Sequence, residues 1–178
     1  MKRRQLIKTG LLGGLSIGAV SAGAVWLNVP ANIAPLTIAV ALKKLDKLSR
    51  QEILSSGEWS PYQIFTHCAQ SIEFSLSGFP EHKSEFFKNT AGQLAFSAFS
   101  TKGQMTHSLS EPIPGAPRIE LVPDIQSALN RFKRSLIDFQ QFEGKLAAHF
   151  AYGELSKPDY ERAHVMHFYN HLHEITVS

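Results

Sequence analysis

The stretch Trp59-Ser60-Pro61-Tyr62-Gln63-Ile64-Phe65-Thr66-His67 indicates the fold class, because it carries a complete helix-start signal. Its serine is an N-cap residue, its proline fits the first helical position, and its glutamine completes a capping box. Apolar residues follow as far as Leu76, and Gly78 and Pro80 then stop the helix. The stretch therefore predicts a helix over residues 61–76 that carries His67.

Four further segments have helical spacing or helical start signals, whereas strand signals are weak. Apolar residues at helical spacing begin after Pro35, Asp124 opens a fourth helix, and Ser156 with Pro158 opens the last one. Gly92 weakens the third helix, since glycine costs about 1 kcal/mol in a helix interior. No internal repeat is apparent. The predicted helices cover residues 36–48, 61–76, 84–99, 124–144 and 156 to beyond 172.

Residues 100–123 form a long connection that cannot be helical throughout, because Pro112-Ile113-Pro114-Gly115-Ala116-Pro117 lies within it. A connection of that length in a compact domain is usually either functional or disordered. Together with the helices, it predicts an all-α fold, namely an antiparallel four-helix bundle with a long irregular crossover loop.

The first residues have the layout of an export signal. Arg3-Arg4-Gln5-Leu6-Ile7-Lys8 resembles the twin-arginine signal, and an uncharged run from Leu11 to Leu27 follows. Cleavage is expected after Ala24 or, later, after Ala34. We therefore predict a signal peptide with a short linker over residues 1–34, the twin-arginine translocation machinery as a partner, and export to the periplasm. The alternative is a membrane anchor formed by an uncleaved signal, although the glycines of this run disfavour it.

The positive charge of the chain belongs to this signal. The full chain has 18 basic and 15 acidic residues, and residues 1–34 hold four of the basic ones and none of the acidic ones. The predicted domain over residues 35–178 therefore has 14 basic residues against 15 acidic ones, and no basic cluster that could follow a nucleic-acid backbone. The single cysteine, Cys68, excludes an internal disulfide and a multi-cysteine zinc site.

Eight histidines are a surplus for 178 residues, and four of them lie in the last predicted helix. His164, His167 and His171 fall within about 60° of one another on a helix, whereas His173 points away. His167 and His171 are an i, i+4 pair, a spacing at which two imidazoles can share a cation. Two ligands do not make a stable site. The best third candidate is His67, because an imidazole among apolar residues needs a hydrogen-bond partner or a metal.

The stretch quoted first and His167-Phe168-Tyr169-Asn170-His171-Leu172 together resemble the DinB/YfiT superfamily of metal-binding four-helix bundles. The chain is similar in particular to a branch of unknown function within that superfamily, which shares three further segments. The resemblance covers essentially all of residues 36–173. The three shared segments are Gln-Ser-Ile-Glu-Phe-Ser-Leu-Ser-Gly-Phe-Pro at 70–80, Pro-Ile-Pro-Gly-Ala-Pro at 112–117 and His-Phe-Ala-Tyr-Gly at 149–153.

The resemblance implies that His67, His167 and His171 hold a divalent metal ion, zinc or nickel, with open positions for water. Asn170 stands where relatives often have a further histidine, and Glu174 where glutamine is common. The function implied is that of an exported metal-binding bundle, with hydrolysis by a metal-bound water as the leading activity. The alternatives are a non-catalytic ligand-binding or interaction bundle with structural histidines, and a thiol-dependent transferase as found elsewhere in the superfamily.

The remaining candidates are neighbours of the site, and no residue is singled out as catalytic. His107 and His149 lie in the two loops expected to cover one end of the bundle, and His164 and Glu174 are candidates for the surroundings of the ligands. Each histidine also has a structural interpretation, as a solvated helix face or a hydrogen-bonded core residue. The ligand is an unidentified small molecule, and a homodimer is an expected assembly. His82 and His173 are expected at the surface.

Overall fold

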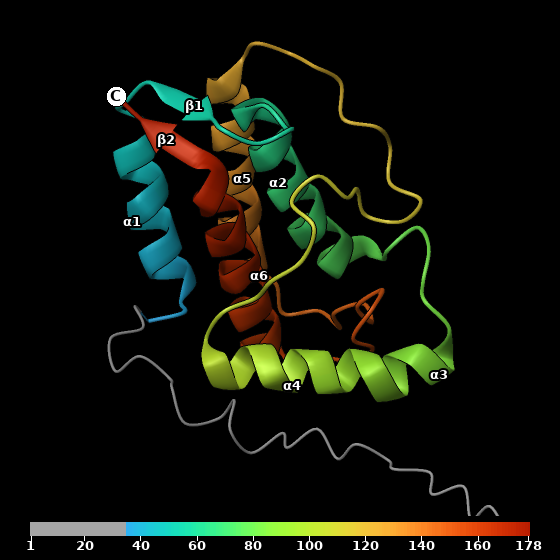
Figure 1. Cartoon of the computed structure of the whole chain (residues 1–178). Helices are drawn as coiled ribbons and strands as arrows, with labels where there is room; N and C mark the ends of the chain where they lie inside the picture. The colour runs from blue at the N-terminus through green and yellow to red at the C-terminus, as the bar shows by residue number, and fades with distance from the viewer. Residues whose placement is uncertain (1–34) are drawn as a thin grey trace, which may run out of the picture.

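The computed structural model describes residues 35–178, so the predicted signal peptide lies outside the described residues. Most of this part of the chain is helical, as predicted (Figure 1). None of its helices is long and apolar enough to cross a membrane. In chain order the elements are α1 (Ile38–Leu48), β1 (Ile53–Ser55), α2 (Pro61–Ser77), α3 (Glu85–Phe87), a π-helical turn (Lys88–Gly92), α4 (Gln93–Lys102), α5 (Ile125–Gln141), α6 (Lys157–His171), a 3₁₀ turn (Leu172–Glu174) and β2 (Ile175–Val177).

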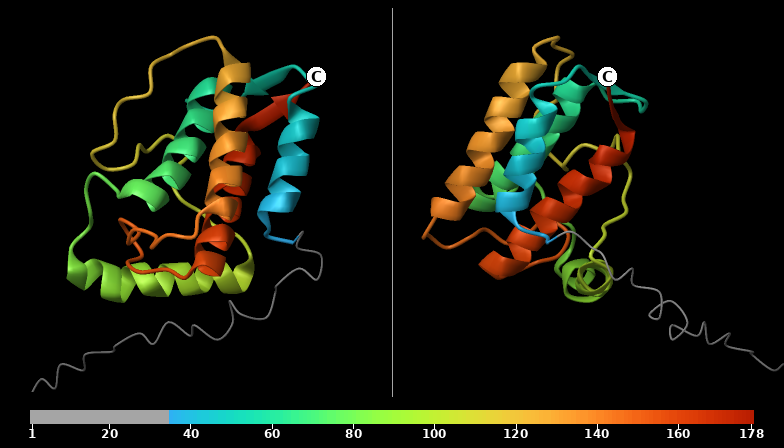
Figure 2. Two further views of the ribbon diagram at one scale, coloured as in Figure 1. Left: turned by 180° about the vertical axis from the view of Figure 1, so that it is seen from behind. Right: turned by 90° about the vertical axis from the view of Figure 1, so that its left-hand side faces the viewer.

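Helices α1, α2, α5 and α6 lie side by side, and α4 crosses beneath one end of them (Figures 1 and 2). Helices α2 and α5 run in the same direction, because Ala147, soon after α5, donates its N–H to the carbonyl of Ser75 near the end of α2 at 2.9 Å. Helices α1 and α6 are also parallel, since Ile38 N–H at the start of α1 bonds to the Glu161 carboxylate near the start of α6 at 2.8 Å. The predicted antiparallel arrangement therefore holds only between these two pairs, because the long crossover returns the chain to the end where α2 begins.

The helix starts agree with the sequence signals. Ser60 Oγ accepts the N–H of Gln63, and the Gln63 side chain accepts the N–H of Ser60, so the capping box is complete. Asp124 and Ser156 cap α5 and α6 in the same way through their side-chain oxygens. Such caps contribute about 1 kcal/mol each. They fix where α2 and α6 begin, and therefore which of their residues face each other.

Aromatic side chains join the three longest helices. The Phe132 ring of α5 lies 6.4 Å from the Phe65 ring of α2 and 5.0 Å from the Phe168 ring of α6, between ring centroids. All three side chains are at most 1% exposed. Burial of such a ring stabilises the fold by about 3–5 kcal/mol relative to alanine. The candidate metal ligands stand beside these rings in the chain, because His67 follows Phe65 by two residues on α2 and His167 directly precedes Phe168 on α6.

The predicted helix over residues 84–99 is correct in place but not in form. The chain forms the short helix α3, then the π-helical turn, then α4, which extends to Lys102. Gly92 ends the π-helical turn, and a Cβ at this position would clash with the carbonyl oxygen of Ala151. Glycine is therefore required here for close approach of the loop at 149–153 rather than being merely tolerated.

Two three-residue strands were not predicted from the sequence. Strands β1 and β2 pair antiparallel, with Ile53 opposite Val177 and Ser55 opposite Ile175. The α-helix α6 ends at His171, so the predicted continuation beyond Leu172 is a 3₁₀ turn followed by β2. The ladder ties the end of α6 to the connection between α1 and α2.

The long crossover is irregular but anchored to the helices. Gly103, with φ of 65°, ends α4, and the segment that follows reaches Asp124 without a regular element. Two side chains of α2 hold it, because Gln70 donates to the Pro117 carbonyl and Gln63 to the Ile119 carbonyl, both at 3.4 Å. Met105 and Ile113 within this segment are buried. We call residues 104–124 the crossover segment.

Candidate metal centre

Helices α2 and α6 bring His67, His167 and His171 together, as the sequence predicted. His67 comes from the second turn of α2, and the other two come from the last turns of α6. His67 is 3% exposed and His171 fully buried, while His167 is partly exposed. One ligand atom from each of the three residues lies within 4.8 Å of the others. The three residues therefore form a convergent nitrogen triad.

The contacts within the triad fit a shared cation better than hydrogen bonds. His167 Nε2 lies 3.1 Å from both His67 Nε2 and His171 Nε2. A neutral imidazole nitrogen carries either one hydrogen or one lone pair, so one ordinary hydrogen bond at His167 leaves the second contact without one. A tetrahedral ion with metal–nitrogen distances of 2.0–2.1 Å would place its nitrogens roughly 3.3 Å apart. The donor set therefore fits a divalent metal ion.

Burial keeps the triad neutral. Burial and, to a smaller extent, the neighbouring imidazoles together lower the pKa of His67 and of His171 to about 3. Burial likewise holds the pKa of His167 well below its ordinary value, with His67 and His171 as additional causes. Neutral imidazole is the form that ligates metals. An ion held by these three residues would keep its full charge, because no carboxylate belongs to the triad.

Trp59, which sequence reasoning did not single out as a site residue, covers the triad on one side. Its ring stacks on His171 at 6.2 Å and 7°, and meets His67 edge-on at 4.9 Å. The Nδ1 atoms of His67 and His171 are buried and have no hydrogen-bond partner among residues 35–178. The tryptophan stands directly before the capping box, so the same signal that starts α2 also places this ring.

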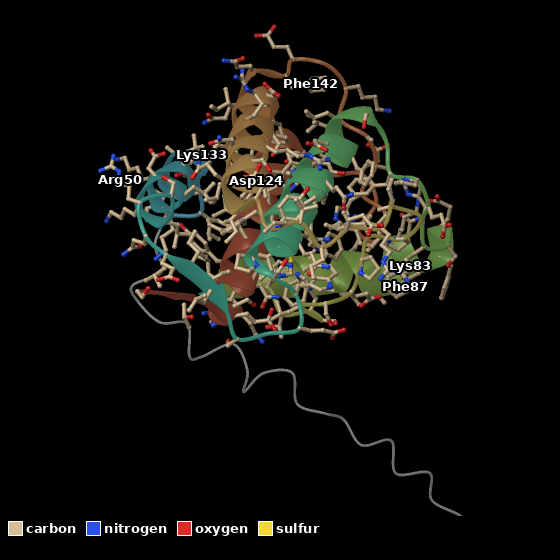
Figure 3. The ribbon with its side chains drawn as sticks, turned by 90° about the horizontal axis from the view of Figure 1, so that it is seen from above. Arg50, Lys83, Phe87, Asp124, Lys133 and Phe142 are labelled. Carbon is tan, nitrogen blue, oxygen red and sulfur yellow. The ribbon has the colours of Figure 1, made fainter. Side chains whose placement is uncertain are left out.

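A cavity of about 310 Å³ opens on the other side of the triad. His67 and His167 line it, and the crossover segment and the loop at 149–152 form its walls. Lys83 and Phe87, labelled in Figure 3, belong to the same wall near α3. The lining is mostly apolar, which is typical of small-molecule sites. Its apolar members include Met105, Ile113, Phe150 and Tyr152.

His107 also lines this cavity, and it adds a fourth imidazole beside the triad. Its ring centroid lies 4.9 Å from that of His167 and 5.3 Å from that of His171. Its Nδ1 lies 2.6 Å from the carbonyl oxygen of Ser108. Burial lowers the pKa of His107, although this hydrogen bond and Glu111 act in the opposite direction.

His149 lines the cavity but its hydrogen bonds are those of a structural residue. Its Nδ1 accepts the N–H groups of Ala151 at 3.1 Å and Tyr152 at 3.2 Å. Its ring stacks on Tyr152 with 4.3 Å between centroids and 8° between planes. Burial holds the pKa of His149 well below its ordinary value, so the ring stays neutral and can accept both bonds. His149 therefore folds its own loop.

The other two sequence candidates lie apart from the ligand atoms. His164 is buried and bonds through Nε2 to Ser75 Oγ at 3.2 Å, and its ring stacks on Tyr160 at 5.3 Å. Burial lowers the pKa of His164 to about 3. The Glu174 carboxylate lies over Gly57, and its Oε2 is buried without a hydrogen-bond partner among residues 35–178.

Cys68 and the two histidines that the sequence placed at the surface, His82 and His173, lie outside the site. Cys68 is buried, and burial raises the pKa of its thiol, so it stays protonated. His82 and His173 are exposed.

Residues 36–178 match the family described as "Protein of unknown function (DUF1569)". No curated protein and no solved structure matches the chain. Because the match extends over most of the chain and includes every residue of the triad and its cavity, the chain belongs to the DUF1569 family.

Proposed function

We propose that the chain binds one divalent metal ion, zinc or nickel, through His67, His167 and His171, and that it is a metal-dependent hydrolase. The observation that carries the proposal is the convergence of three Nε2 atoms with two contacts of 3.1 Å around His167. Three neutral ligands with a cavity on the open side are typical of catalytic metal sites rather than closed structural ones.

The chemistry would depend on the open side of the triad. When bound there, a divalent ion makes water more acidic and polarises a carbonyl or phosphoryl oxygen. His67, His167 and His171 would hold the ion, and the mostly apolar cavity lining would exclude bulk water and orient the substrate. The cavity of about 310 Å³ suits a small substrate.

The proposal also includes the type of fold and the location of the protein. We assign the domain to the DinB/YfiT type of four-helix bundle, with α1, α2, α5 and α6 as its helices. The resemblance at Trp59–His67 and His167–Leu172 supports this, together with the placement of the ligands on the second and last of these helices. The twin-arginine signal over residues 1–34 supports export to the periplasm.

Metal analysis of the purified protein tests the proposal. We expect about one zinc or nickel ion per chain after purification without chelator. At a zinc concentration about 1,000-fold above Kd, the free energy of unfolding should rise by about 4 kcal/mol, which thermal denaturation measures. Bound metal below about 0.1 equivalent, with no stabilisation by added zinc or nickel, would overturn the proposal.

Catalysis needs a separate measurement. The metal-loaded protein should hydrolyse a small activated ester such as 4-nitrophenyl acetate, and chelation should abolish the reaction. Metal binding without turnover of any ester, amide or phosphoester in a broad panel would favour the second candidate, a non-catalytic binder of small apolar ligands. The mostly apolar cavity lining is the observation that favours that candidate.

A further inference from the structure

The ring of His107 stands against the triad but does not belong to it. Its centroid distances to His167 and His171, 4.9 and 5.3 Å, are close to those between rings within the triad, which are 4.9 to 5.2 Å. The group of mutually close ligand atoms nevertheless consists of His67, His167 and His171 alone among the described residues. His107 is therefore placed one step outside the ligands, at the cavity that His67 and His167 also line.

The hydrogen bond at Nδ1 fixes the tautomer of His107. The carbonyl oxygen of Ser108, 2.6 Å away, can only accept, so Nδ1 carries the hydrogen of the neutral ring. Nε2 is then left with a lone pair and no hydrogen. It can serve only as an acceptor.

This acceptor has no donor within the described part of the protein. His107 Nε2 is buried and has no hydrogen-bond partner among residues 35–178. A buried polar atom without a partner costs about 1–3 kcal/mol, so it is rarely left in this state without a function. A donor brought by a ligand would satisfy it.

The segment that carries His107 is held to the helix that carries two of the ligands. Asn170 lies between His167 and His171 on α6, and its side-chain amide donates to the carbonyl of His107 at 3.5 Å. Met105, two residues before His107, is buried against α6 residues Ala163 and Met166. The position of the fourth ring is therefore defined relative to the triad.

We propose that His107 selects the ligand of this site, by accepting through Nε2 a hydrogen bond from an N–H or O–H group next to the ligand atom that binds the metal. The ligand class is small and largely apolar, like the cavity, and it has a metal-binding oxygen with an N–H or O–H donor on a neighbouring group, as in an amide or a hydroxamic acid. The inference rests on the proposed function, because it assumes that the triad holds a metal ion.

Two probe ligands test it on the cobalt-loaded protein, whose visible absorption reports binding at the metal. Acetohydroxamate keeps an N–H donor beside its metal-binding oxygens, whereas thiocyanate has no donor. We expect His107→Ala to weaken acetohydroxamate binding about ten-fold, the effect of one lost hydrogen bond, and to leave thiocyanate binding within about two-fold. Cobalt affinity should stay within about three-fold, since His107 neither belongs to the triad nor forms a hydrogen bond to any of its three residues.

The controls separate this inference from the proposed function. His82→Ala, at an exposed position, should change neither probe. If the alanine variant does not fold by circular dichroism, His107→Leu fills the space without an acceptor and is judged by the same criteria. Equal weakening of both probes, unchanged acetohydroxamate binding, or loss of cobalt by the variant would overturn the role of His107. Absence of cobalt binding by the unmodified protein would instead overturn the proposed function.

Discussion

The two helices that carry the triad and the crossover segment that carries His107 place imidazoles side by side by different means. His167 and His171 meet because they are four residues apart on α6, so local helix geometry is sufficient. His107 reaches them through contacts distant in sequence, from Asn170 and from the α2 side chains Gln63 and Gln70. The ligands are thus on rigid elements, and the neighbour expected to select the ligand is on a loop.

The largest expected effect is on metal affinity and comes from the triad on α2 and α6. His167→Ala removes the nitrogen that contacts both other ligands, so zinc affinity should fall by more than about 100-fold, a loss larger than changes around a metal site usually cause. Competition with a chromogenic chelator measures the affinity. His173→Ala, exposed on the following turn, should bind zinc as before. Retention of affinity by His167→Ala would mean that the triad is not the site.

The second effect concerns stability instead of metal affinity, and it lies in the other loop that lines the cavity, residues 149–152. His149→Ala removes the acceptor of two backbone N–H groups, at Ala151 and Tyr152, and also the ring stacked on Tyr152. We expect the free energy of unfolding to fall by about 3 kcal/mol, because two partly buried donors lose their partner and the ring stacked on Tyr152 is removed. Urea denaturation measures this. Zinc affinity should change far less than in His167→Ala, and a loss of comparable size would place His149 in the metal site.

The same division explains what could be predicted from the sequence. The capping box at Ser60, the caps of the later helices and the histidine spacing are local signals, and they predicted the helices and the pair His167 and His171. The choice of His67 as the third ligand rested on the family resemblance. Strands β1 and β2 are three residues each and gain their pairing from the fold, so no local pattern announces them. The parallel course of α2 and α5 and the tautomer of His107 likewise depend on contacts across the chain.

A third effect concerns the close contact between Gly92, at the end of the π-helical turn, and the loop at residues 149–153. Gly92→Ala adds a methyl group against the carbonyl oxygen of Ala151, and backbone cannot move aside as easily as a side chain. We expect the free energy of unfolding to fall by about 1–3 kcal/mol, as in other overpacked sites. Gly78→Ala is a useful comparison because a Cβ at that position has open space but sits at φ of 108°. A larger loss at Gly78 than at Gly92 would show that backbone conformation outweighs the contact with the loop.

The smallest effect is a pH dependence that comes from the helical core. Burial lowers the pKa of His164 to about 3 in the folded protein, whereas an unfolded chain has a histidine pKa of about 6.5. Below pH 6.5 the unfolded state therefore binds the proton and the folded state does not, so this contribution is fully present above pH 6.5 and is lost as the pH falls towards 3. Between pH 7.5 and pH 5.0 the loss is about 2 kcal/mol.

His164→Gln isolates that contribution, because glutamine can still donate to Ser75 Oγ but does not titrate. In the presence of chelator, the variant should lose about 2 kcal/mol less stability than the unmodified protein between the two pH values, measured by urea denaturation. The triad histidines and His149 remain in both proteins, so their shared pH dependence cancels in the difference. An equal loss in both proteins would mean that His164 takes up its proton in the folded state, and that this part of the core admits water.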